Sequence, residues 1–402
     1  MKLDVARAIA DAVLMEGYVL YPYRASAPKN RFRWTFGVLA PRAWSEAGGC
    51  ESWWLEAQVL VAGAPTRIAA QLRFVHIERR RLEALDGTPL ARLDCGDLVL
   101  EPWDEGIDRT VDVEITTEPS DASFCFPGAL TVEERETGRV VRQRHPLEGV
   151  VTTRWEELDA PRPLARLTIR VENTTPWPEL DASRGSAIAG AFASTHLLLG
   201  VEGGQLLSAI DPPPWASQAA ARCKNVRTYP VLAGPPGTGD VALLAPFILY
   251  DHPMLAPESA GDLCDATEID ELLMLRTRTL TDDEKRQARA TDARAAQIIE
   301  RAEMLPAADL ARMHGNTRDV VDGEMVPRRP KVGDKVRLRT STRRTDAQDF
   351  LYAGHIATVA ALREDVDGTT HVAVTIDDDP AAELHDWYGR YHYYRLDEVD
   401  VL

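Results

Sequence analysis

The sequence RTVDVEI at residues 109–115 and the sequence RLTIRVE at residues 166–172 decide the fold class. Apolar and polar residues alternate from Val111 onward in the first and throughout the second. Successive side chains of a β-strand point to opposite faces, so this alternation indicates strands with one buried face. Between them, the residues Glu136-Thr137-Gly138 separate two further strand-like runs and predict a hairpin turn. Similar runs, broken by Pro and Gly, follow one another from about residue 34 to residue 250. We therefore predict a mainly β protein of the α+β kind. Its body, residues 1–250, is expected to be a sandwich or a distorted barrel, with a boundary near 145–180 if it has two subdomains.

The chain changes character after residue 250. Thr267 and Thr281 each precede acidic residues that suit the first turn of a helix, so we predict helices within 251–314, beginning after residue 265. Residues 315–330 end in Pro-Arg-Arg-Pro, show little periodicity and predict a linker. Short strand-like runs around Gly333-Asp334 and Gly354-His355 then predict a small SH3-like barrel at residues 331–402.

Composition limits the classes of function. The 402 residues carry a formal charge of −17, whereas nucleic-acid binding needs a concentrated basic face, so we expect no nucleic-acid partner. The N-terminus predicts a short amphipathic helix without signal-peptide features, and no stretch is apolar enough for a membrane span. The five cysteines are scattered and form no Cys-x-x-Cys pair, which favours buried thiols in the cytoplasm over disulfides or a zinc ribbon.

The sequence GPPGTGDV at residues 234–241 imitates a phosphate-binding loop. A true loop of this kind places Lys and then Ser or Thr after the last Gly, to bind the phosphates and magnesium. Here Asp240 and Val241 stand at those positions, and a carboxylate there would repel phosphate. We therefore predict no nucleotide cofactor, and a turn between strands at Tyr229–Leu232 and Ala242–Tyr250.

An acidic segment follows the body. Residues 251–271 carry seven carboxylates and no Lys or Arg, together with one His and one Cys. Three interpretations stay open: helix caps and loop solvation, a docking surface for a basic partner, or a metal site that would support a metal-dependent enzyme around Asp251, His252 and Asp262. The spacing matches no common metal motif. The candidate partner-binding residues are Asp251, His252, Glu258, Asp262, Asp265 and Glu268.

Aromatic and basic residues near the N-terminus form another candidate recognition surface. Tyr, Trp and Arg dominate the energetics of protein interfaces, and this segment combines all three. The alternative is a segment packed along the body with its aromatic rings in the core. The residues concerned are Tyr21, Tyr23, Arg24, Arg31 and Trp34.

The C-terminal histidines His385 and His392 lie among aromatic residues, which favours an aromatic hairpin over a metal site. No nucleophile elbow and no cysteine-centred catalytic signature is present. The sequence therefore predicts no catalytic residue, cofactor or resident metal.

Several stretches resemble a bacterial family of hydrogenase-associated accessory proteins, encoded beside uptake nickel–iron hydrogenase genes. The resemblance rests on YPYRAS at 21–26 with RWTFGVL at 33–39, on CKN at 223–225 with YPVL at 229–232, and on ILYDHP at 248–253 with DATEIDE at 265–271. It extends over nearly the whole chain, including the terminal barrel. It implies a role in the assembly, maturation or support of a hydrogenase, with a hydrogenase subunit or maturation factor as the protein partner. It assigns no activity and no catalytic residues.

Overall fold

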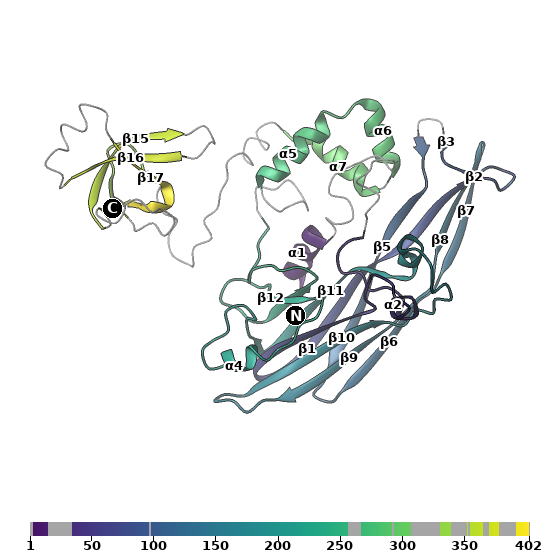
Figure 1. Ribbon diagram of the computed structural model, residues 1–402, viewed down its shortest axis with the longest axis horizontal. Coiled ribbons are helices and arrows are strands. Elements are labelled where there is room, and N and C mark those ends of the chain that lie inside the picture. Colours follow the sequence, from purple (N-terminus) through teal and green to yellow (C-terminus); the bar gives the residue numbers. More distant parts are fainter. Residues whose placement is uncertain are drawn as a thin grey trace. The chain divides into compact units, whose positions relative to one another are not determined.

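The computed structural model describes residues 3–14, 34–95, 98–255, 267–291, 293–306, 330–338, 352, 354–364, 370–377 and 391–401. These residues form a mostly β protein with large antiparallel sheets, which confirms the predicted fold class. The chain divides into two compact units, residues 1–316 and 317–402 (Figure 1). The division falls within the segment 315–330 that we predicted to be a linker.

One very long strand organises the body. β1 (Trp54–Glu83) pairs along its first part with β10 (Leu164–Asn173). Further along it pairs with β11 (Phe192–Leu206) on one edge and with β5 (Trp103–Ile115) on the other. By their hydrogen bonds these strands form one 11-stranded sheet, and β1 bends so that the sheet has two layers, called the two sheets below.

β1 turns from one sheet into the other at residues 63–67, where its pairing with β11 shifts register. Gly63 has a φ of 88°, a region that favours glycine, and Pro65 has no N–H for the ladder. Before this corner the side chains that point into the core lie at odd positions such as Leu55. After it they lie at even positions such as Leu72. The change of parity keeps one apolar face turned inward in both sheets.

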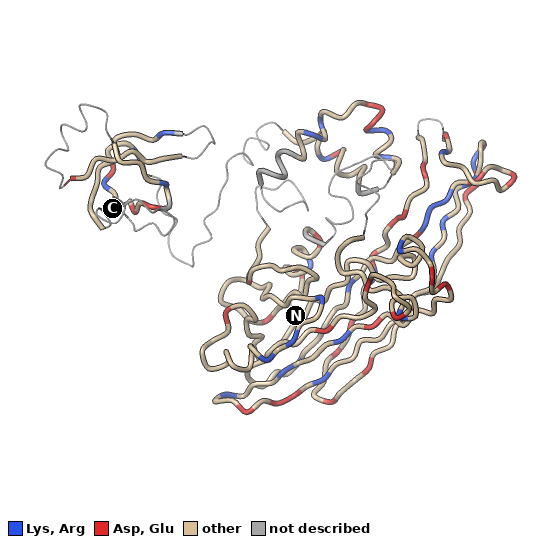
Figure 2. Tube along the Cα trace, viewed as in Figure 1, with Lys and Arg blue, Asp and Glu red and all other residues tan. Residues whose placement is uncertain are grey.

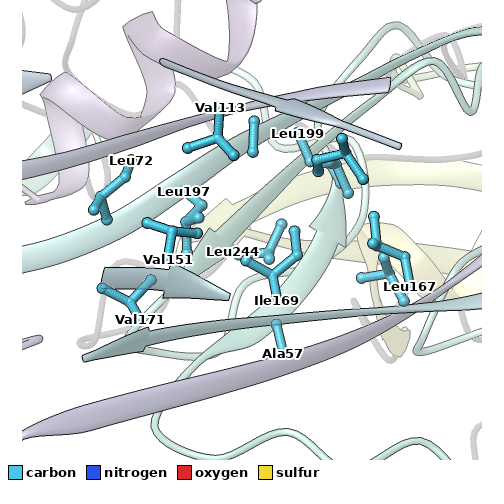
Figure 3. Packing of buried hydrophobic residues seen from close by; sticks show 14 of the residues in the cluster. Ala57, Leu72, Val113, Val151, Leu167, Ile169, Val171, Leu197, Leu199 and Leu244 are labelled. Atoms are coloured by element: carbon cyan, nitrogen blue, oxygen red, sulfur yellow. The ribbon is translucent and has the colours of Figure 1, made fainter. Parts of the chain in front are cut away.

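The two sheets enclose the main core. In one, β6 (Ser120–Phe126) and β9 (Leu147–Glu157) follow β10. In the other, β13 (Val241–Ala245) and β12 (Tyr229–Leu232) follow β11. Figure 3 shows Leu72, Val151, Leu197 and other side chains from both sheets meeting in this interior. This arrangement is sandwich-like, and the described strands form no closed barrel.

A smaller ribbon extends the far end of β1. β8 (Gly138–Arg144) pairs with β1 and with β7 (Ala129–Arg135), and residues 136–137 between them form the predicted hairpin turn. The short strand β2 (Pro89–Leu90) also pairs with β1, and β3 (Leu93–Cys95) and β4 (Leu98–Leu100) form a separate two-stranded sheet.

The basic run at residues 79–81 lies in this ribbon, and carboxylates of β5 pair with Arg79 and Arg80 and with Arg142 of β8. Arg79 lies 3.1 Å from Asp104, and Arg142 lies 2.9 Å from Glu105. Figure 2 shows the basic stretches of β1 and β8 interleaved with acidic ones. Arg79 and Arg80 of this run are thus paired with carboxylates within the sheet.

Helices cover parts of the body. α1 (Asp4–Leu14) packs on the outer face of β11 and β13, where its Ala6, Ile9 and Ala10 join a second core. Short helical segments occur at α2 (Arg42–Glu46), α3 (Arg184–Ala187), η2 (Ile188–Gly190) and α4 (Ser217–Ala220).

The helical segment after residue 265 is present as predicted. It comprises α5 (Thr267–Arg278), α6 (Asp282–Thr291) and α7 (Ala293–Met304). Thr281 and Glu284 form the expected capping box at the start of α6. The buried Arg80 of β1 donates to the carbonyls of Ala290 and Thr291 at the end of α6, at 3.2 and 3.1 Å, and so ties this helix to the body.

The C-terminal unit is a five-stranded antiparallel sheet in the order β17-β16-β15-β14-β18. Its strands are β14 (Lys335–Leu338), β15 (Ile356–Glu364), β16 (Thr370–Ile376), β17 (His392–Arg395) and β18 (Val399–Val401), with η3 (Leu396–Glu398) before the last. Hydrogen bonds between the described strands do not close this sheet into the SH3-like barrel that we predicted. Its core contains Tyr394, so the aromatic segment near the C-terminus contributes to packing.

Candidate functional site

A loop after β13 carries three strongly exposed large apolar side chains, including Tyr250, the most exposed of those described. We expected this strand to run to Tyr250, but it ends at Ala245. Pro246 follows directly, and because proline lacks an N–H it cannot continue the ladder. Residues 247–255, here called the display loop, then pass beside β12.

Asp251 anchors the display loop with both carboxylate oxygens. Oδ1 accepts a hydrogen bond of 2.8 Å from the backbone N–H of Leu232, on the edge of β12. Oδ2 accepts from the hydroxyl of Ser208. The Ser208 oxygen in turn accepts from the N–H groups of Ile210 and Asp211, so one carboxylate ties together three segments of chain.

His252 provides a second anchor. Its N–H donates to the carbonyl of Leu232 at 2.6 Å, and its Nδ1 lies 2.9 Å from the carbonyl oxygen of Gly234. A carbonyl can only accept, so Nδ1 carries the proton. His252 also has a φ of 55°, in the left-handed region that costs about 1 kcal/mol or more for a residue other than glycine. The surrounding bonds hold this conformation in place, which makes the display loop a rigid feature.

The display loop alternates between inward and outward side chains. Phe247, Leu249 and Leu255 pack against the second core beneath α1. Ile248, Tyr250 and Met254 point outward and are 74%, 85% and 64% exposed. Large apolar side chains on a rigid, exposed loop are typical of a protein contact surface, because burying them against a partner removes them from water at little cost in loop entropy.

The chemistry available at Asp251 and His252 is limited by these same bonds. Ser208, Asp251 and His252 are residue types found in catalytic triads, but His252 Nδ1 faces Gly234 and the Ser208 hydroxyl is fully engaged. Both Asp251 oxygens already accept hydrogen bonds. Within the described residues, no three His, Cys, Asp or Glu side chains are grouped to hold a metal ion. The geometry of this pair therefore fits structural anchoring.

The other candidate partner-binding residues lie outside the display loop. Trp34 is buried, 3% exposed, and packs with Val38 and Val75, while its carbonyl accepts a hydrogen bond from Arg184. It therefore follows the packed alternative that the sequence left open. Glu268 lies in the first turn of α5. The remaining candidates lie outside the described residues: Tyr21, Tyr23, Arg24, Arg31, Glu258, Asp262 and Asp265.

A second cluster has the composition of an interface but is closed on itself. Arg170 stacks 3.9 Å from the ring centre of Trp54, and Arg42 stacks 4.3 Å from that of Trp53. Arg227 lies 5.4 Å from Trp54 on a further segment of chain. Carboxylates also pair with Arg170, so this stack fastens α2, β10 and the segment before β12 to the start of β1.

The imidazole of His76 belongs to the fold and not to a reactive site. Its Nε2 lies 2.8 Å from the carbonyl oxygen of His145, and Arg109 approaches its Nδ1 at 3.4 Å. Burial, opposed in part by the hydrogen bond to His145 and reinforced by the charges of Arg109 and Arg144, lowers the pKa of His76 to about 4. The ring is therefore neutral near pH 7.

Comparison with known proteins adds no relative. Neither the protein-family models nor the curated proteins contain a match for this sequence. None of the described helices has the length and apolar character needed to cross a lipid bilayer.

The sequence interpretation singled out Asp251 and His252 as contact residues and missed their exposed neighbours. The missed signal is the pair Pro246 and Pro253, which bracket the apolar run. Proline within a strand lacks the N–H that a central ladder needs, so this bracketing weakens the prediction of a strand that runs from Ala242 through Pro246 to Tyr250.

Proposed function

We propose that this protein is a non-catalytic accessory or scaffold protein that acts by binding another protein through its display loop. The observation that carries the proposal is the contrast between the anchors and the outward side chains. Asp251 and His252 fix the backbone, while Ile248, Tyr250 and Met254 are exposed to solvent. A preorganised loop that exposes one aromatic and two other large apolar side chains suits the buried centre of a protein interface.

The sequence supplies two further elements of the proposal. The resemblance makes a subunit or maturation factor of an uptake nickel–iron hydrogenase the first partner to test. The acidic residues that follow the display loop favour a partner with a basic surface, whose association would slow as salt rises. The proposal also includes a cytoplasmic location, based on the scattered cysteines, and no nucleic-acid partner, based on the net charge of −17.

The test is affinity capture from cells that express the hydrogenase, with quantitative mass spectrometry of the recovered subunits. Three tagged proteins are compared: the wild type, a variant with Ile248→Ala, Tyr250→Ala and Met254→Ala, and a control with Leu130→Ala and Val132→Ala. The control residues are also exposed, at 65% and 54%, but lie on β7. We expect the loop variant alone to lose the hydrogenase subunits. Equal recovery with all three proteins, or recovery of none above an empty-tag control, would contradict the proposal.

A further inference from the structure

A buried polar pair lies beneath α1. Arg73 on β1 and His196 on β11 are direct partners across the antiparallel ladder, so their side chains lie on the same face of the sheet. Leu198, two residues after His196, packs against Ala6, Ile9 and Ala10 of α1, which places this face under the helix. Arg73 is 8% exposed and His196 is 1% exposed.

The protonation state of His196 follows from its surroundings. Nδ1 lies 2.7 Å from the carbonyl oxygen of Ser194, which can only accept, so Nδ1 carries the proton. Burial and the nearby charge of Arg73 lower the pKa of His196 to about 3, against the opposing effect of that hydrogen bond, so the ring is neutral. Nε2 is then an acceptor with a free lone pair.

The backbone is strained to make this arrangement. Ser194 has a φ of 53°, and its N–H is held by the carbonyl of Phe36 at 3.1 Å. That conformation directs the Ser194 carbonyl to the ring of His196 and fixes the tautomer. A strained backbone conformation of this kind persists only where the surrounding contacts hold it in place.

Two buried polar atoms of the pair have no protein partner. Arg73 forms an ion pair with Asp11 of α1, whose Oδ1 lies 2.7 Å from Nη2, but neither that oxygen nor Arg73 Nη1 makes a hydrogen bond. The Nε2 atom of His196 makes none either. Native structures rarely leave such groups buried and unsatisfied, and here two of them belong to residues that are partners across one ladder.

The two atoms define the chemistry of what would satisfy them. Nη1 needs an acceptor and Nε2 needs a donor, and one hydroxyl oxygen supplies both. A halide would satisfy Arg73 but has no proton for Nε2. A metal ion would suit Nε2, whose opposite nitrogen bonds a carbonyl as in many metal sites, but the adjacent guanidinium repels it.

We infer that Arg73 and His196 form a buried site for one neutral hydroxyl ligand, which accepts from Arg73 Nη1 and donates to His196 Nε2. Water is the smallest molecule with this chemistry, and a small alcohol is the other source. Because Arg73 also pairs with Asp11, the ligand links the docking of α1 to the ladder between β1 and β11.

The decisive experiment combines a crystal structure of the full chain, at a resolution that shows ordered water, with nitrogen-15 NMR of the histidine rings. We expect one isolated density peak at about 3 Å from both Arg73 Nη1 and His196 Nε2. We also expect His196 to be in the Nδ1–H form. His76 is the internal control, because its Nε2 faces a carbonyl and it should be in the opposite Nε2–H form.

Two variants and a metal titration complete the test. Arg73→Met should remove the density peak and Arg73→Lys should keep it; if either fails to fold, the wild-type density and tautomer still decide. A peak of one atom identifies water, and an extended peak identifies a small alcohol. An Nε2–H tautomer at His196, a site without density, or a shift of the His196 signals on adding zinc would each overturn the inference.

Discussion

Asp251→Asn should loosen the display loop without unfolding the body. The carboxylate accepts from Leu232 and from Ser208, and an amide can accept at only one of these two places. The oxygen of Ser208 already accepts from Ile210 and Asp211, so the amide nitrogen gains nothing by turning toward it. One charge-assisted hydrogen bond is lost, which is worth about 2 kcal/mol.

A loss of about 2 kcal/mol in the free energy of local opening raises the population of the open loop about 30-fold. The backbone N–H of His252 reports this directly, because it bonds Leu232 at 2.6 Å only while the loop is docked. Hydrogen exchange measured at that amide should therefore quicken about 30-fold, while amides of β9 and β10 keep their wild-type rates.

Asp211→Asn is the matched control. Asp211 lies close to Ser208 and undergoes the same chemical change, but its side chain is exposed and makes no contact with another described side chain. Exchange at His252 should stay within about twofold of the wild type in this variant. If Asp251→Asn also leaves the His252 amide within about threefold, then the carboxylate does not hold the loop and the argument for a rigid display surface fails.

Three further predictions concern the fold. Arg80→Met should lower the free energy of unfolding of the body by about 3 kcal/mol, because Glu105 and the end of α6 lose a buried partner. The exposed neighbour Arg81 is the control, and Arg81→Met should change the free energy of unfolding by less than about 0.5 kcal/mol. Equal urea midpoints for the two variants would contradict the role of Arg80. Deletion of residues 331–402 should leave residues 1–330 with a cooperative thermal transition, since the C-terminal sheet has its own core; aggregation of the shortened chain would show that the two units share a core. The folded pKa of His76, about 4, lies below its unfolded value near 6.5, so the unfolded state binds more protons and stability should fall as pH drops from 6.5 to 4. The urea midpoint, measured at three pH values in this window, should depend less steeply on pH in His76→Phe than in the wild type.

The sequence predicted the elements whose cause is local. Alternation at residues 109–115 and 166–172 marks β5 and β10, because both strands have one face in the core. The capping box of Thr281 and Glu284 sets the start of α6, and the turn at residues 136–137 joins β7 and β8. In each case the residues that determine the structure are neighbours in the chain.

The features that depend on distant contacts could not be predicted in this way. β1 is a single 30-residue strand because both of its edges find partners from far along the chain, and no local pattern specifies the corner at Gly63. Likewise, the sequence marks Asp251 only as a candidate contact or metal residue, because its hydrogen bonds are made with Ser208 and Leu232, 43 and 19 residues away. Acidic residues in a sequence indicate charge, and only the fold shows which of them are used as anchors.

Direct titration of the purified chain with a purified hydrogenase subunit recovered in the capture experiment tests the central claim. Replacement of Ile248, Tyr250 and Met254 by alanine should raise the dissociation constant at least about 30-fold, as expected when a central interface cluster is removed. The matched replacement of Leu130 and Val132 on β7 should leave it within about twofold. Equal affinities for the wild type and the loop variant would show that the display loop is not the contact surface.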